Sequence, residues 1–231
     1  MLPWVKLDET VMPGGGPLKL MQRGTEFSIM SGVIELMNSR LSGSEEQLAT
    51  LSAARIGTRA RPRILIGGLG MGFTLRAALA SFGPDSEIVV AELVPEVVAW
   101  ARGPLAPIHG ASLDDPRVVI HLGDVATAIG AGKPFDAILL DVDNGPDGLS
   151  RPANDRLYNA TGLAAARAAL TPGGHLAVWS SAPDAQFTRR LRRADLAVEE
   201  LAVRASKSGR GARHTIWFAT RPGGKSLNAA G

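Results

Sequence analysis

The residues best suited to bind a ligand are four glycines that directly follow an apolar run. They are Gly67, Gly68, Gly70 and Gly72. The apolar run is 64–66, and a helix-like stretch follows at 73–81. Glycine lets the backbone adopt positive φ and approach a ligand closely, while the free N–H groups at the start of a helix point outward. The pattern therefore predicts a strand, a glycine turn and a helix that cradle a nucleotide or nucleoside.

Three carboxylates end or follow the next three strand-like runs. Glu92 closes the run 87–92, Asp124 comes shortly after 118–122, and Asp141 directly follows 135–140. Ligands of open parallel α/β sheets bind beyond the carboxyl ends of the strands, so we expect these side chains near the glycine turn. Glu92 also lies 20 residues after Gly72, about the interval at which an acid hydrogen-bonds a ribose diol in nucleotide-binding folds.

Each of these signals also has a purely structural interpretation. The glycines could form a close-packed turn, Glu92 could stabilise a helix start, and Asp124 is a natural N-cap. A dinucleotide site is another alternative, but the loop runs G-G-x-G-x-G rather than G-x-G-x-x-G. Because no His–acid pair suited to hydride transfer is evident, the sequence favours an S-adenosylmethionine-type ligand.

The segment after the fourth strand holds further polar candidates for substrate binding, namely Asp143, Asn144 and Asp147. Asp143 and Asp147 could bind an ammonium group, although aspartates in a Gly/Pro-rich loop are commonly turn formers. Tyr158 and Trp179 are candidates to flank the pocket, with core packing as the alternative for both. The chain has no cysteine and its four histidines show no metal-ligand spacing, so no metal is expected.

The elements that would position these residues alternate between strands and helices. After 63–66, strands are predicted at 87–92, 118–122, 135–140 and 175–180, and helices at 73–81, 94–102, 124–130 and 158–170. Such alternation indicates a parallel sheet with helices on both faces, which is a three-layer Rossmann-like α/β fold. A helix at 183–194 and strands at 196–204 and 214–220 would end the domain with an antiparallel edge.

The chain divides into four predicted parts. Residues 1–17 are rich in Pro and Gly and are expected to be a flexible arm, and 221–231 a flexible tail. Residues 18–60 form a small β region and a linking helix that begins at an N-cap, Ser44. Residues 61–220 form the ligand-binding α/β domain.

Composition restricts the class of protein. With 231 residues, 45% of them hydrophobic, the chain can bury a substantial core. It shows no secretory leader and no apolar stretch approaching 18 residues, so we expect a soluble, cytoplasmic protein without membrane contact. The sequence pI is about 9.7, yet the arginines at 189–193 are expected to form a solvated helix face rather than a nucleic-acid surface.

Together these motifs resemble the spermidine synthase (polyamine aminopropyltransferase) family, which shares its nucleoside-binding domain with S-adenosylmethionine-dependent methyltransferases. The likeness extends from about 18 to 220, and it is carried by the stretches 35–46, 66–72, 90–92, 115–124, 135–141, 145–146 with 157–158, and 217–220. The resemblance implies a methyltransferase-type sheet and either decarboxylated S-adenosylmethionine or S-adenosylmethionine as cosubstrate. It also implies a small-molecule amine as acceptor and a homodimer.

The resemblance further implies a role for each motif. Residues 67–72 would pass close to the sulfonium and its amino-bearing tail, Glu92 would hold the ribose hydroxyls, and Asp124 would accept a hydrogen bond from the adenine amino group. Asp141 would occupy the family's catalytic acid position. There a carboxylate can orient and deprotonate an amine that attacks the carbon next to the sulfonium.

Three departures from the family leave the reaction open. The glycine loop lacks the family's Asp, which we place at Gly70, and a bare Gly70 would admit the carboxylate of ordinary S-adenosylmethionine. The Asp-x-x-Asp motif after the fourth strand reads Asp141-Val142-Asp143-Asn144, and the amine-binding Tyr is missing from 42–46. Aminopropyl transfer is therefore the leading hypothesis, methyl transfer its rival, and a non-catalytic nucleoside-binding module the third.

Overall fold

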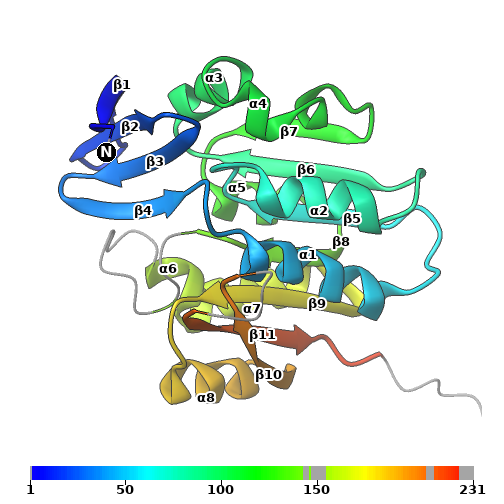
Figure 1. Cartoon of the computed structure of the whole chain (residues 1–231). Helices are drawn as coiled ribbons and strands as arrows, with labels where there is room; N and C mark the ends of the chain where they lie inside the picture. Colours follow the sequence, from blue (N-terminus) through cyan, green and yellow to red (C-terminus); the bar gives the residue numbers. More distant parts are fainter. Residues whose placement is uncertain (1, 143–145, 147–154, 207–210, 224–231) are drawn as a thin grey trace, which may run out of the picture.

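The central sheet is mostly parallel and has an antiparallel edge (Figure 1). The computed structural model describes residues 2–142, 146, 155–206 and 211–223, and among these the sheet has seven strands in the order β10-β11-β9-β8-β5-β6-β7. They are β5 Arg63–Gly67, β6 Glu87–Glu92, β7 Val118–Leu122, β8 Phe135–Leu140, β9 Leu170–Ser180, β10 Ala197–Arg204 and β11 Arg213–Thr220. β5 pairs in parallel with β6 and β8, whereas β11 is antiparallel to β9 and β10, which confirms the predicted sheet.

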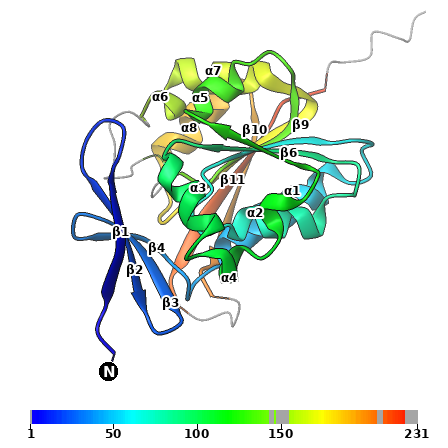
Figure 2. The ribbon, with the colours of Figure 1, turned by 90° about the horizontal axis from the view of Figure 1, so that it is seen from above.

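Helices cover both faces of this sheet (Figure 2). One face carries α1 Gly43–Ile56, α2 Phe73–Ser81, α3 Pro95–Arg102 and α4 Ala106–His109, and the 3-10 helix η1 Ser112–Asp114 precedes β7. The other face carries α5 Val125–Ile129, α6 Asp155–Tyr158, α7 Ala160–Ala169 and α8 Ala185–Arg193. Within the described ranges, no helix has the length and apolar character needed to cross a membrane.

The central strands are apolar on both faces because helices bury both. On β5, Ile64 and Ile66 belong to the core on the α1–α3 side, whereas Leu65 between them belongs to the core on the α5, α7 and α8 side. Unbroken apolar runs are what a sheet covered on both faces requires. Polar residues can therefore gather only where the strands end, and the carboxyl ends become the edge that receives a ligand.

A small N-terminal sheet in the order β1-β2-β3-β4 is antiparallel and packs at those carboxyl ends (Figure 1). Its strands are β1 Val5–Val11, β2 Pro17–Arg23, β3 Glu26–Ser31 and β4 Ile34–Asn38. The expectation of a flexible arm over 1–17 was wrong for 5–11, which form β1. The glycine run 14–16 takes positive φ and closes the β1–β2 hairpin, where Met12 N donates to Gly16 O at 3.0 Å. Trp100 Nε1 of α3 donates to Asp8 Oδ2 at 2.7 Å and joins β1 to the larger domain.

His175 on β9 makes the stability of this fold depend on pH. Its ring is 1% exposed and packs edge-on against Phe218, and burial, helped by Arg55 and Arg59, lowers its pKa to about 4. In the unfolded chain, the His175 ring takes up a proton near its ordinary pKa of 6.5. The stability that the neutral buried ring contributes is therefore fully present above pH 6.5 and is lost as the pH falls toward 4.

Between pH 7.5 and pH 5, this histidine is expected to remove about 2 kcal/mol from the free energy of unfolding. Urea unfolding at both pH values checks this for the wild-type protein and His175→Gln. The variant, which lacks the titrating ring, should show the smaller pH dependence. An equal pH dependence in the two proteins would contradict the role of His175.

Candidate active site

The glycine loop lies where β5 ends, between β6 and β8. Gly68 N donates to Ala91 O at 2.9 Å, and Asp141 N donates to Gly67 O at 3.0 Å, so the loop is bound to both neighbouring strands. Gly68 has φ +90°, and a Cβ there would lie 2.6 Å from the Asp141 carbonyl oxygen. Backbone conformation and packing both require glycine at this position. The loop and the start of the Asp141 segment are therefore built against each other.

Glu92, at the end of β6, is 7% exposed and holds the loop through its carboxylate. Oε2 accepts a hydrogen bond from Leu69 N at 2.9 Å, and Oε1 accepts one from Val94 N at 2.8 Å. Burial raises the pKa of this carboxyl, and the backbone N–H groups oppose that effect. Because Glu92 also lines the cavity over the loop, its remaining lone pairs can accept hydrogen bonds from hydroxyl groups of a ligand.

Asp124 follows β7 and is the N-cap of α5, as the structural interpretation predicted. Its Oδ1 accepts a hydrogen bond from Ala126 N at 2.8 Å. Its Oδ2 forms an ion pair with Arg156 of α6. Asp124 also lines the same cavity as Glu92. A ligand donor that reached Oδ2 would therefore compete with the Arg156 guanidinium.

Asp141 directly follows β8 and contacts the helices on the α1–α3 face. Its Oδ2 accepts a hydrogen bond from Thr74 Oγ1 of α2 at 2.6 Å. Burial, together with the carboxylate of Glu45 on α1, raises the pKa of Asp141 to about 7. A carboxyl that titrates near neutral pH can exchange a proton with an amine nucleophile. The structure brings Asp141 beside the glycine loop, and its catalytic role stays a prediction.

Two adjoining cavities meet at Asp141. The larger, of about 130 Å³, lies over the glycine loop beside Glu92 and Asp124, and apolar side chains of β2, β3 and β4 line its other side. The smaller, of about 90 Å³, extends from the loop toward Glu45 and Trp179. The residues that line both cavities are Leu36, Met37, Gly68, Gly70 and Asp141. A donor in the first cavity and an acceptor in the second would meet at this shared wall, which suits a group transfer.

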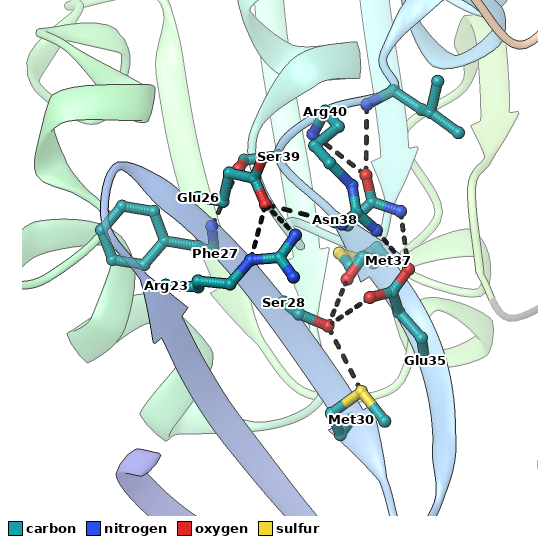
Figure 3. Close-up of polar contacts among 11 residues, drawn as sticks. Arg23, Glu26, Phe27, Ser28, Met30, Glu35, Met37, Asn38, Ser39 and Arg40 are labelled. Carbon is teal, nitrogen blue, oxygen red and sulfur yellow. Dashed lines mark hydrogen bonds and ion pairs between the residues drawn. The ribbon is translucent and has the colours of Figure 1, made fainter. Parts of the chain in front are cut away.

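Met37 of β4 occupies the space next to Gly70. A Cβ at Gly70 would lie 2.6 Å from Met37 Sδ, and the backbone at Gly70 has φ +48°. The expectation that a bare Gly70 admits the carboxylate of ordinary S-adenosylmethionine stays a prediction, and the Met37 thioether is the side chain that lies against this position. Figure 3 shows the polar contacts that hold β4 on β3. Ser28 Oγ donates to Glu35 Oε2 at 2.8 Å and lies 3.5 Å from Met37 O.

Gly72, the last glycine of the loop, is required by backbone conformation and packing. It precedes α2 with φ +74°, and the ring of His109 from α4 leaves no room for a Cβ. Burial lowers the pKa of His109 to about 4, so the ring packs against the loop as a neutral group near pH 7. Because Gly72 also lines the smaller cavity, its predicted contact with the cosubstrate stays a prediction.

The remaining predicted residues lie in different places. Tyr158 lines neither cavity, and its buried ring packs edge-on against Phe187 with ring centres 5.6 Å apart. The expected substrate contact of Tyr158 is thus corrected to core packing, because α6 and α8 bring two apolar rings together beneath the sheet. Trp179 does line the smaller cavity. The candidates Asp143, Asn144 and Asp147 lie outside the described residues, as does the tail from 224 onward.

Sequence reasoning missed Glu45, the Ser44 hydroxyl that donates to it, and His214, which contacts Ser44. Ser44 was expected as the N-cap of α1, but Ser42 has that position. The Ser44 hydroxyl instead donates to Glu45 Oε2 at 2.7 Å and lies 2.8 Å from His214 Nδ1 of β11. In the sequence, Glu45 is only an acid at the start of a predicted helix. Such an acid interacts favourably with the helix dipole, so it gave no reason to expect a functional site.

Comparisons with known proteins bear on both sequence and fold. No protein-family model matches the sequence. The polyamine aminopropyltransferase of Mycobacterium tuberculosis (strain ATCC 25618 / H37Rv) is 37% identical over 128 residues, which are 54% of this chain and 23% of that protein. Putrescine N-methyltransferase 1 of Nicotiana tabacum is 35% identical over 114 residues, which are 48% of this chain and 28% of that protein. The matched segments thus span less than a third of the length of these relatives.

Solved structures give the class of fold. Spermidine synthase from Thermotoga maritima superposes with a TM-score of 0.72 at 19% identity, over 94% of this chain and 72% of that chain. Human methyltransferase-like protein 13 in complex with SAH superposes with a TM-score of 0.56 at 22% identity, over 80% and 85% of the two chains. The chain therefore has the Rossmann-like methyltransferase-type α/β fold, preceded by a small antiparallel sheet. Within this class it resembles the polyamine aminopropyltransferases in sequence and the spermidine synthases in structure.

Proposed function

We propose that this protein is a transferase that moves an aminopropyl group from decarboxylated S-adenosylmethionine to an amine acceptor. The observation that carries the proposal is the meeting of two cavities at Asp141, one beside Glu92 and Asp124 and the other beside Glu45. The sequence resemblance to polyamine aminopropyltransferases supports the choice of the transferred group.

In the proposed reaction, the amine nitrogen of the acceptor attacks the carbon next to the sulfonium. The N–C bond forms as the C–S bond breaks, and the bonding electron pair stays on sulfur, which becomes a neutral thioether. The nitrogen loses a proton, and Asp141 accepts it. The hydrogen bond from Thr74 Oγ1, at 2.6 Å, keeps the carboxylate oriented for that step.

The larger cavity is proposed to hold the nucleoside of the cosubstrate. Glu92 suits the ribose hydroxyls, because two backbone N–H groups fix its carboxylate and further lone pairs remain. Asp124 suits the adenine amino group through Oδ2, in competition with Arg156. The sulfonium and its chain would then pass Gly70 and reach the wall that the two cavities share.

Methyl transfer from S-adenosylmethionine is the second candidate, because a putrescine N-methyltransferase also matches the sequence. Both reactions need the same attack by an amine, and they differ in whether the cosubstrate tail carries a carboxylate. Met37 Sδ lies 2.6 Å from the position that a Cβ of Gly70 would take, so this part of the wall is a thioether rather than a hydrogen-bond donor. Burying a carboxylate without donors is costly, which supports the decarboxylated cosubstrate.

We also propose that the protein is a cytoplasmic homodimer associated through its N-terminal sheet. Large apolar side chains are exposed on that sheet, namely Val5, Leu7, Val11, Val33 and Ile34. Exposed apolar patches of this kind commonly mark interaction surfaces. A chain that sediments as a monomer at micromolar concentration would contradict the dimer.

Calorimetric titration with the two forms of the cosubstrate tests the proposed function. The decarboxylated form is expected to bind more tightly, and incubation with putrescine should yield the aminopropylated amine together with the thioether nucleoside. Product analysis by mass spectrometry separates this outcome from a methylated amine. Tighter binding of S-adenosylmethionine and a methylated product would replace aminopropyl transfer by methyl transfer. Binding of neither form would leave the non-catalytic module as the better hypothesis.

A further inference from the structure

A second carboxylate, Glu45 of α1, shares the smaller cavity with Asp141. Thr74 Oγ1 contacts both residues, because it donates to the Asp141 carboxylate at Oδ2, 2.6 Å away, and lies 3.3 Å from the backbone carbonyl oxygen of Glu45. Ser44 Oγ donates to Glu45 Oε2 at 2.7 Å and fixes that carboxylate in turn. Elements that are distant in sequence thus hold two acids at one cavity.

Among the residues that the structure describes, no Lys or Arg side chain forms an ion pair with either of these two acids. Burial raises the pKa of Glu45, and Glu46 adds to that effect, while burial and Glu45 raise the pKa of Asp141. Within the described part of the chain, the groups that shift these two pKa values include no Lys or Arg side chain. Two carboxylates that share a site repel each other when both are ionised, and a proton or a bound cation relieves the repulsion.

A third group at this cavity also lacks a partner. Trp179, at the end of β9, lines the cavity and is 8% exposed. Its indole Nε1–H has no hydrogen-bond partner among the residues that the structure describes. A buried donor without an acceptor costs free energy, so its presence beside two carboxyl groups without a described basic partner points to a ligand at this place.

We propose that Glu45 and Asp141 together bind the acceptor amine, and that Glu45 is the second acid of the catalytic site. This inference rests on the proposed transfer to an amine. An ammonium or amine group supplies the donors that both carboxylates can accept, and Trp179 offers an aromatic surface to a cation and its alkyl chain. Glu45 then provides from α1 the second carboxylate that the segment 141–144 does not retain in the family's spacing.

The contacts beyond Glu45 also provide a route for the proton that the reaction releases. Ser44 Oγ lies 2.8 Å from His214 Nδ1, so Glu45, Ser44 and His214 form one chain of hydrogen bonds. As the N–C bond forms, the acceptor nitrogen loses one proton to Asp141, and this proton passes to the Glu45 carboxylate of the same cavity. Protonated Glu45 then donates to Ser44 Oγ, and the Ser44 hydroxyl turns to donate its own proton to Nδ1 of neutral His214, in the tautomer that carries the ring hydrogen on Nε2. The charge balances, because the positive charge lost by the sulfonium ends on the imidazolium. Burial lowers the pKa of His214, which favours onward release of the proton to solvent.

The test compares Glu45→Gln with the wild-type protein, with putrescine as the acceptor and the cosubstrate that the wild type uses. We expect kcat/KM for the amine to fall by about 10- to 100-fold, as for the loss of a charged hydrogen bond. The affinity for the cosubstrate, measured by calorimetry, should stay unchanged. The acidic limb of the pH profile of kcat/KM should move to lower pH, since Asp141 then titrates without a second carboxylate beside it.

Two further variants separate a catalytic role of Glu45 from a structural one. Glu45→Asp keeps the acid and should recover part of the lost activity. Glu199→Gln removes an exposed carboxylate of β10 that pairs at 2.6 Å with Arg55 of α1, the helix that carries Glu45, and it should behave like the wild type. The titratable groups that surround Glu45 are Glu46, Asp141 and His214, and all of them are unchanged in these variants.

An unchanged kcat/KM and an unshifted acidic limb in Glu45→Gln would overturn the proposal. The proposed function fails separately, if the wild-type protein forms no product from either cosubstrate. In that case calorimetric titration with putrescine still decides the inference. Weaker binding to Glu45→Gln than to the wild type would support the amine site, and equal binding would reject it.

Discussion

Turnover by Asp141→Asn is expected to fall by about 10²- to 10⁴-fold, the range attributed to a positioned general base. Asn has nearly the same shape and can still accept the hydrogen bond that Thr74 Oγ1 donates at 2.6 Å. It cannot take up a proton, and it does not attract an ammonium group. The cosubstrate affinity should be retained, because Glu92 and Asp124 are untouched. Initial rates and a calorimetric titration with the cosubstrate measure the two effects separately.

The pH profile gives this prediction a second readout. Asp141 has a pKa of about 7, and its ionised form is the one that accepts a proton, so wild-type kcat/KM should rise with pH through that region. The Asn variant should lack this limb. Asp114→Asn is a matched control, because Asp114 is 73% exposed and pairs with Arg102 on the surface. Turnover of Asp141→Asn near the wild-type level would remove Asp141 from the catalytic role.

The central sheet and one half of the site could be predicted from sequence because their signals are local. Runs such as 135–140 are buried on both faces, and the residues after them must lie at one edge of a parallel sheet. From that rule alone, Glu92, Asp124 and Asp141 could be predicted to lie near the glycine loop. The side of the larger cavity that these three residues line could therefore be predicted without knowledge of contacts between distant elements.

The other half of the site could not be predicted, because it depends on contacts between distant elements. Ser44 and His214 are 170 residues apart in sequence, and they meet only because α1 packs across β11. Met37 reaches Gly70 from a different sheet. Residues 5–11 were misjudged for a related reason, since a Gly/Pro-rich composition nearby suits a hairpin turn as well as a flexible arm.

Gly68→Ala is expected to lower the free energy of unfolding by about 2 to 5 kcal/mol, the sum of a left-handed backbone and an overpacked contact. The added Cβ would lie 2.6 Å from the Asp141 carbonyl oxygen, and the φ of +90° already disfavours an L side chain. The backbone at Asp141 belongs to the wall that the two cavities share, so the displacement should also weaken cosubstrate binding. Urea unfolding and calorimetry with the cosubstrate measure these effects.

The variant Gly110→Ala separates backbone strain from the steric clash as causes of the lost stability. Gly110 has φ +57°, and a Cβ there would have no atom within 4 Å, so that variant carries backbone strain without a steric clash. It should lose only about 1 to 2 kcal/mol and bind the cosubstrate normally. The additional loss in the free energy of unfolding of Gly68→Ala, compared with Gly110→Ala, then measures the effect of the close contact between the glycine loop and Asp141. If both variants lost equal stability and kept equal affinity, that contact would not constrain the site.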